Sequence, residues 1–202
     1  MRGLKVEGVI LKRRNLGEAD RILTVFSQQK GKISVLAKGV RRITSRRSGN
    51  VELLNRSLMY LHQAKTFLIL TEAQSLDTFQ KIKTDLTLST YAYHIIELVD
   101  KLTAENQENR VLYEYLVEVL RRLERNPRQI LIRAFETKIL SNLGFIAFEQ
   151  DLLKKLENYP WDEIEKMKIN ANQAMELERV LRYHVERVIE GQLKSRRFLK
   201  KI

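Results

Sequence analysis

The spacing of hydrophobic residues changes near residue 80, and this change constrains the fold more than any other feature of the sequence. Before it, Ile33, Val35 and Ala37 alternate with polar residues, which is the period of a half-buried β-strand. After it, the apolar positions from Leu88 to Leu102 are four and three residues apart, as on one face of a helix. The sequence therefore predicts an α+β protein of two domains, a β domain over 1–80 and an all-helical domain over 81–202.

The β domain is expected to contain five strands. Short segments rich in Val, Ile, Leu, Thr and aromatic residues, each bounded by turn-forming residues, occupy 5–12, 21–27, 32–38, 57–63 and 66–75. Residues 28–31 and 63–65 are predicted turns, and the longest connection runs over about 39–56. Five strands in so short a stretch favour a small closed barrel of the oligonucleotide-binding (OB) type, with an SH3-like barrel as the alternative.

Helical periodicity continues to the end of the second domain. Further helices are expected over about 112–123, from Asn126-Pro127 to Leu143, and over 177–188. Asn126 is predicted to cap the second of these, and Gly144 and Gly191 to end the second and third. The segment 148–170 predicts one or two short helices broken before Pro160.

Composition excludes several classes of protein. The 202 residues include no cysteine, so disulfides and thiolate metal sites are excluded. No apolar run approaches the roughly 20 residues that span a bilayer, and Lys5, Glu7 and Lys12 interrupt the N-terminal apolar residues where a signal peptide would need them continuous. We therefore expect a cytoplasmic protein without a membrane partner.

Positive charge is concentrated at the two ends of the chain. The net charge is +12, and residues 1–80 hold 15 basic and 6 acidic side chains, while residues 191–202 hold five basic and none acidic. The segment KGVRRITSRRSGN, residues 38–50, contains five of these cations, with Gly39 and Gly49 near its two ends. Charge clustered in this way is typical of proteins that bind polyanions, nucleic acid first and anionic membrane surfaces second, although charge runs also occur as solvated faces.

No set of residues predicts an enzyme. The three histidines, His62, His94 and His184, lie in different elements without ligand spacing, and His94 and His184 are expected to be hydrogen-bonded residues of the core or its boundary. Glu18 and Asp20 could hold Mg²⁺ for phosphodiester cleavage, but a role in a turn is favoured. We expect neither a cofactor nor a metal.

The basic residues do predict a mechanism of nucleic-acid binding. The predicted DNA-binding residues are Lys38, Arg41, Arg42, Arg46 and Arg47 in the loop, then Arg13, Arg14 and Arg21, with Lys12 and Lys32 extending the same surface. A second basic patch consists of Lys194, Arg196 and Arg197. Each phosphate neutralised by such cations releases counterions, so binding should weaken as salt rises.

Aromatic residues suitable for stacking on bases are few in the first domain. It offers Phe26, Tyr60, Phe67 and Phe79, and most of these are expected in the core. Binding is therefore predicted to be mainly electrostatic, insensitive to sequence, and tolerant of single and double strands.

The order of these segments resembles the RecO family of bacterial recombination mediators. The resemblance rests on "EGVILKRRNLGEADRILTVFSQQKGKISVLAKGVRR" followed by "SRRSG", and it continues through "LILTEAQSLDTFQKIKTDL", "LSTYAYHIIELVDKLT", "RAFETKILSNLGF" and "LKSRRFL". It implies an OB barrel followed by an all-helical domain, binding of single- and double-stranded DNA, and annealing of complementary strands. It further implies contact with the acidic C-terminal tail of the single-strand binding protein SSB, and work with RecR to help RecA load onto SSB-coated DNA in the bacterial nucleoid.

One departure from the family pattern is plain. Many family members carry a four-cysteine zinc module after the Leu-Gly-Phe helix, whereas here Leu143-Gly144-Phe145 leads into a segment without cysteine. The segment around Trp161 is expected to replace that module as packing.

Three other functions stay open. An RNA-binding OB module would use the same barrel and basic loop. A Mg²⁺-dependent nuclease would use Glu18 and Asp20. An adaptor would act through its helical domain alone, with incidental charge on the barrel. The sequence favours a non-enzymatic DNA-binding mediator over these.

Overall fold

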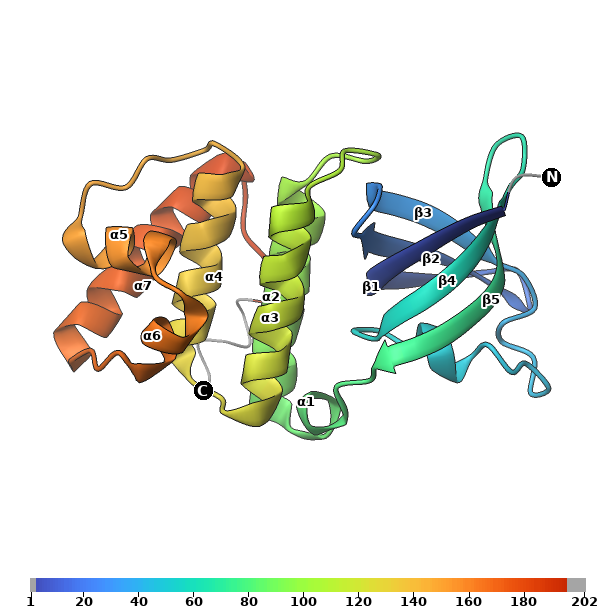
Figure 1. The fold of residues 1–202 in the computed structure, drawn as a ribbon, viewed down its shortest axis with the longest axis horizontal. Helices are drawn as coiled ribbons and strands as arrows, with labels where there is room; N and C mark the ends of the chain where they lie inside the picture. Colours follow the sequence, from blue (N-terminus) through green and yellow to red (C-terminus); the bar gives the residue numbers. More distant parts are fainter. Residues whose placement is uncertain (1–2, 196–202) are drawn as a thin grey trace. The chain divides into compact units, whose positions relative to one another are not determined.

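Five strands in the described part of the chain close into a barrel (Figure 1). The computed structural model describes residues 3–195. The strands are β1 (Gly3–Leu16), β2 (Asp20–Ser27), β3 (Gly31–Ala37), β4 (Arg56–Gln63) and β5 (Leu68–Asp77). Their order around the barrel is β1-β2-β3-β5-β4, with β3 and β5 parallel and the other pairs antiparallel. The predicted OB-type barrel followed by helices is confirmed.

The alternating residues that predicted the strands fill the barrel. The core consists of Val6, Ile10, Leu23, Val25, Ile33, Val35, Ala37, Val40, Val51, Met59, Leu61 and Leu70. Val40 and Val51 belong to the connection between β3 and β4, and Val51 lies in a 3₁₀ helix, η1 (Gly49–Val51). The connection therefore enters the core at two points, and the residues between them are exposed or half-buried.

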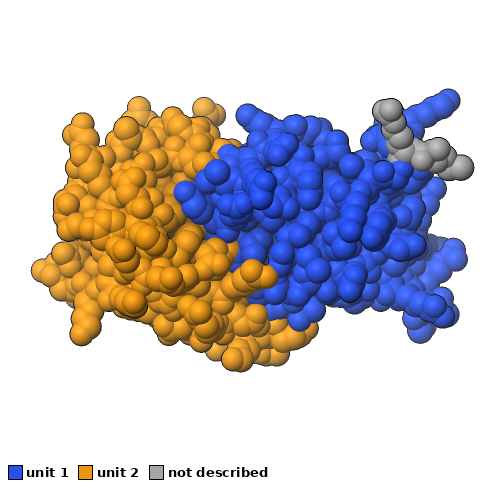
Figure 2. Space-filling model, viewed as in Figure 1, with its two compact units in different colours: residues 1–79, 103–117 blue, residues 80–102, 118–202 orange. Residues whose placement is uncertain are grey.

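The chain divides into two compact units, shown in two colours in Figure 2. One unit combines residues 1–79 with 103–117, and the other combines 80–102 with 118–202. The chain thus leaves the barrel unit at residue 79, returns to it at 103 and leaves again after 117. A division between residues 80 and 81 alone, as predicted, makes no provision for this return.

The returning segment is bonded to the barrel strands. The Asn106 N–H donates to the carbonyl of Lys32 at 2.8 Å, and the Tyr113 hydroxyl donates to Glu7 Oε1, also at 2.8 Å. The Tyr113 ring lies 6.5 Å, between centroids, from the ring of Phe26. Phe26 is completely buried although β2 alternation turns it away from the barrel interior. Residues 103–117 therefore cover part of the outer face of the barrel.

An ionic network at the same place joins three segments. Arg56 on β4 pairs with Glu7 at 2.6 Å and with Asp77 at 2.7 Å. Burial lowers the pKa of Arg56, but its hydrogen bonds to Asp77 and Glu7 outweigh this effect and raise the pKa above its ordinary value. Arg56 is therefore charged whenever the protein is folded.

The rest of the described chain is helical. The helices are α1 (Gln80–Thr84), α2 (Leu86–Leu102), α3 (Arg110–Arg125), α4 (Gln129–Asn142), α5 (Asp151–Asn158), α6 (Trp161–Lys166) and α7 (Ala171–Val188). α4 contacts α2, α5, α6 and α7, and nearly all of its residues from Ile130 to Leu140 are buried. It is the central helix of its unit, and α5 and α6 are the two short helices predicted on either side of Pro160.

One predicted helix end is wrong, and another is displaced by one residue. Helix α4 begins at Gln129, and the Asn126 side chain donates to Glu165 across 2.9 Å, so Asn126 is not its cap. Helix α7 ends at Val188; Glu190, with φ of 51°, takes the left-handed position after it, and the N–H of Gly191, the residue predicted to end the helix, donates to the Glu186 carbonyl. At the end of α4 the prediction is confirmed: Gly144 has φ of 74° and its N–H donates to the Ser141 carbonyl.

Candidate nucleic-acid interface

The basic loop between β3 and β4 is fastened to the turn between β1 and β2. Asp20 Oδ1 accepts a hydrogen bond from the Gly39 N–H at 2.7 Å. The Arg41 N–H donates to the Ala19 carbonyl, and the Arg41 guanidinium donates to the Gly17 carbonyl at 3.0 Å. The turn around Gly17–Asp20 and the basic loop from Lys38 are separated by 17 residues in sequence. These hydrogen bonds therefore hold them together in the structure.

Arg47 holds the other side of the loop. Its guanidinium donates to the carbonyls of Leu70, on β5, and of Lys38, each at 2.8 Å. The hydroxyl of Ser48 donates to the Ser45 carbonyl, which closes a turn within the loop. Because Arg41 and Arg47 both bond to backbone carbonyls, part of the predicted DNA-binding charge has a structural task.

Four of the predicted cations do not hold the loop or any other part of residues 3–195 in place. The side chains of Lys38, Arg42, Arg46 and Arg14 are exposed and make neither an ion pair nor a hydrogen bond to that part of the chain. Ile43, between Arg42 and Arg46, is fully exposed. These four cations are the ones whose charge is available to a polyanion without breaking a bond in the protein.

Arg13 and Arg21 are instead neutralised by one carboxylate. Glu52, which follows η1, pairs with Arg13 and lies 3.5 Å from Arg21. Arg21 also donates to the Asn15 side chain at 3.3 Å. Both arginines are mostly buried against their neighbours, so a phosphate would have to compete with Glu52 for them.

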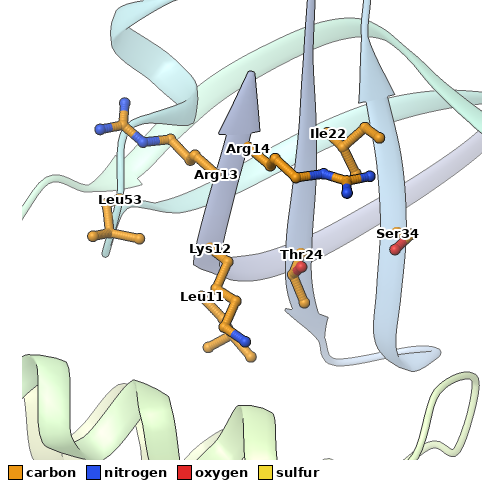
Figure 3. Close-up of a pocket in the computed structure, with 8 residues that line it drawn as sticks. All are labelled: Leu11, Lys12, Arg13, Arg14, Ile22, Thr24, Ser34 and Leu53. Atoms are coloured by element: carbon orange, nitrogen blue, oxygen red, sulfur yellow. The ribbon is translucent and has the colours of Figure 1, made fainter. Parts of the chain in front are cut away.

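A hollow lies on the outer surface of the barrel beside these residues (Figure 3). It has a volume of about 440 Å³ and is lined by Leu11, Lys12, Arg13, Arg14, Ile22, Thr24, Ser34 and Leu53. Figure 3 shows Arg13 and Arg14 extending to opposite sides of β1, with Arg14 directed over β2. The lining therefore combines cations from β1 with apolar and hydroxyl side chains from β2 and β3.

The remaining predicted residues are Lys12, Lys32 and the second basic patch. Lys12 lies in the hollow, and Lys32 lies on β3, where its carbonyl accepts from Asn106. In the second basic patch, the Lys194 N–H donates to Glu97 Oε1 at 2.9 Å. Arg196 and Arg197 lie outside the described residues.

His94 and Asp20 make hydrogen bonds within the protein. His94 is buried, with Nε2 2.6 Å from Glu136 and Nδ1 3.3 Å from Ser195, as expected of a core histidine. Burial and the charge of Arg187 lower the pKa of His184. Asp20 is the loop fastener described above. Within residues 3–195 no three His, Asp or Glu side chains are grouped so that they could hold a metal ion, and no helix there has the length and apolar character to cross a bilayer.

Sequence reasoning missed two features of this surface. Glu52 is the only acidic residue between residues 21 and 71, and its isolation in a basic stretch is the signal that could have identified it as a partner of arginines. The expectation that most aromatic residues of the first domain are in the core is wrong for two of the four. Phe26 and Phe79 are buried, but Tyr60 and Phe67 are 41% and 54% exposed.

Comparison with known proteins gives a consistent family. Residues 1–79 match the family model of the recombination protein O N terminal, and residues 83–147 that of its C terminal. The DNA repair protein RecO of Acetivibrio thermocellus is 38% identical over 76% of this chain and 62% of its own length. The RecO proteins of Pelotomaculum thermopropionicum and Roseiflexus sp. are 28% and 34% identical, over 98% and 70% of this chain and 94% and 50% of their own lengths.

Two of these three matches thus span less than two thirds of the relative. The family models nevertheless cover the barrel and most of the helices up to residue 147, in the order found in the structure. The chain therefore belongs to the RecO family of DNA repair proteins.

Proposed function

We propose that this protein is a DNA-binding mediator of recombinational repair, which binds single- and double-stranded DNA and anneals complementary strands. The observation that carries the proposal is the four exposed cations without a bond to the described protein, Lys38, Arg42 and Arg46 in the loop and Arg14 in the lining of the hollow. The names of the relatives support it, because they are DNA repair proteins.

The mechanism is charge neutralisation and needs no catalytic residue. Two strands held against one cationic surface repel each other less, and the barrier to pairing falls. Because each cation that contacts a phosphate releases condensed counterions, affinity falls steeply as salt rises. In the cell, the strands that need annealing are coated with SSB. The protein acts on this coated DNA in the bacterial cytoplasm, at the nucleoid. It contacts the SSB C-terminal tail and RecR, and it helps RecA to load onto the strand.

The test is annealing of two complementary oligonucleotides coated with SSB. The wild type is compared with Arg42→Ala/Arg46→Ala, which removes two charges without breaking a bond to described residues. The matched control is Lys154→Ala/Arg179→Ala, which removes the same charge from exposed positions on α5 and α7. We expect the control to anneal like the wild type and the loop variant to anneal at least several-fold more slowly.

Two outcomes would contradict the proposal. Equal annealing by all three proteins would remove the loop from the mechanism. Absence of annealing by the wild type, on naked as well as coated strands, would contradict the mediator function itself. Tighter binding of a matched RNA than of the DNA strand would favour the RNA-binding alternative.

A further inference from the structure

The outer face of the barrel carries two rows of side chains that cross the strands. In one row, Arg14 on β1 is paired with Ile22 on β2, Ile22 with Leu36 on β3, and Leu36 with Ile69 on β5. Ile22, Leu36 and Ile69 point away from the core, because Leu23, Val35 and Leu70 next to them along the strands point into it. Arg14 lies on the same face as its partner Ile22. The row begins with a cation and continues with three half-buried apolar residues.

The second row has the same polarity. Lys12 is paired with Thr24, and Thr24 with Ser34. β3 and β5 are parallel with Val35 opposite Leu68, so extending this register by one residue brings Phe67 beside Ser34. Phe67 directly precedes β5, and its carbonyl accepts a hydrogen bond from the Ala64 N–H at 2.9 Å, which fixes the backbone of this turn. The row therefore begins with a cation and ends with an aromatic ring.

Phe67 differs in one respect from the other exposed aromatic residue of the barrel. The Tyr60 ring lies 5.7 Å below the ammonium group of Lys5, so one of its faces is already occupied. Phe67 is 54% exposed, and within residues 3–195 it makes no ring contact or cation–π contact. An exposed Phe costs free energy in water, which contact with another apolar surface would recover.

The two rows match the chemistry of a single nucleic-acid strand. Neighbouring strands of a sheet are about 4.8 Å apart, so the cations of β1 and the start of β5 are separated by roughly 14 Å across three steps. Arg14 extends over β2 and shortens this distance (Figure 3). A nucleotide likewise has its phosphate at one side and its base at the other, and a base has a flat apolar face suited to an aromatic ring.

We infer that Phe67 is a base-stacking residue, with the base lying over the apolar row of Leu36 and Ile69 and the phosphates on Arg14 and Lys12. This inference rests on the proposed function and adds a specificity to it. Bases in a duplex are stacked and paired, so only a single strand can present one to Phe67. The residue therefore gives the barrel a preference for single strands that charge alone does not supply.

The test compares two oligonucleotides that have the same phosphates. One is a thymidine strand and the other an abasic strand of equal length. Binding is measured by fluorescence anisotropy at several salt concentrations. The wild type is expected to bind the thymidine strand about tenfold more tightly than the abasic strand. Phe67→Ala is expected to bind both strands equally, with the salt dependence of the wild type, and Phe67→Trp is expected to restore the tenfold preference.

Tyr60→Ala is the matched control, because it removes an exposed aromatic ring whose face is already covered by Lys5. Its preference for the thymidine strand should equal that of the wild type. Equal binding of the two strands by the wild type would overturn the stacking role of Phe67 while leaving the proposed function standing, as would an equal loss in Tyr60→Ala and Phe67→Ala. If the wild type bound neither strand nor a duplex, the proposed function itself would fail.

Discussion

The carboxylate of Asp20 accepts a hydrogen bond from the backbone N–H of Gly39 across 2.7 Å, and this bond links the β1–β2 turn to the basic loop. Gly39 has φ of 65°, a conformation that favours glycine, and its N–H points at the turn. The acidic residue that could have suggested a nuclease thus positions the cations that bind DNA in the proposed function.

Asp20→Ala should loosen that loop. The lost charge-assisted hydrogen bond is expected to lower the free energy of unfolding by about 1–2 kcal/mol, and hydrogen exchange in residues 38–48 should become faster. Glu18→Ala, at an exposed site in the same turn, is the control and should change neither quantity. Unaltered exchange in the loop of Asp20→Ala would show that other contacts suffice to hold it.

Glu52→Gln should strengthen DNA binding. Without the carboxylate, Arg13 and Arg21 lose their acidic partner and become available to phosphates. Affinity is expected to rise about threefold to tenfold, and the salt dependence to steepen by up to about two counterions. Glu72→Gln removes the same charge from an exposed position on β5 and should give the smaller effect. Equal salt slopes for the two variants would mean that Arg13 and Arg21 do not reach the DNA.

Gly31→Ala should destabilise the barrel unit. Gly31 has φ of 64°, and a Cβ there would lie 1.8 Å from the Gln107 carbonyl oxygen, so segment 103–117 would have to move. We expect a loss of roughly 3 kcal/mol in the free energy of unfolding. Gly49→Ala, where a Cβ meets open space, should be nearly neutral. Urea unfolding of both variants measures the difference, and similar midpoints would contradict the packing described for residues 103–117.

Stability should fall in acid through Glu136. Burial raises the pKa of this carboxyl, but the charge of Arg133 and the hydrogen bond from His94 outweigh burial and lower the pKa to about 2. Since the pKa in the folded state is below that of the unfolded state, the stabilisation is complete above about pH 4.5 and disappears as pH falls towards 2.

The stabilisation lost over that pH interval is about 3 kcal/mol, which corresponds to a little over two pKa units. Glu136→Gln should be less stable than the wild type at pH 7, and its free energy of unfolding should vary less between pH 4.5 and 2. Urea unfolding at a series of pH values measures both. Parallel pH curves for the two proteins would show that other carboxyls cause the acid sensitivity.

Glu190→Gly should stabilise the end of α7. Glu190 has φ of 51°, which costs an L-residue about 1 kcal/mol relative to glycine. The melting temperature should therefore rise by about 3 °C. Gly144→Ala, at the equivalent position after α4, should have the opposite effect of similar size. A lower melting temperature for Glu190→Gly would show that this side chain makes a compensating contact.

The fold was predictable wherever a single local pattern determined it. Alternation in 32–38 and helical spacing from Leu88 to Leu102 each reflect burial of one face, and the structure contains the corresponding strand and helix. Helix ends were less predictable, because Asn126 could cap a helix or bond to a distant side chain. In the structure Glu165, 39 residues away, takes its amide.

The basic residues of the candidate site were predictable from the sequence. Which of them bond to the protein itself, and which are exposed, was not. Composition identified the basic loop, yet the neighbours Arg46 and Arg47 differ in their surroundings: the Arg46 side chain is exposed, whereas Arg47 donates to the carbonyls of Leu70 and Lys38. The carbonyls that accept from Arg47 include one on β5, which no local pattern reveals. Phe67 could not be told from Phe26, because each adjoins an apolar run of a predicted strand and only the packing of Tyr113 separates the buried ring from the exposed one.

The return of residues 103–117 to the barrel determines where the protein can be truncated. A fragment ending at residue 80 would retain every strand but lose Tyr113, which donates to Glu7 and covers Phe26. It would also lose Asn106, which donates to Lys32 at the start of β3. Such a fragment would expose Phe26 and would leave Glu7 with Arg56 but without Tyr113, and it would tend to aggregate. A barrel fragment that keeps these contacts must include helix α2, which lies between the two parts of the barrel unit, and must end beyond residue 117. The smallest stable fragment with the barrel is therefore longer than the segment that contains its strands.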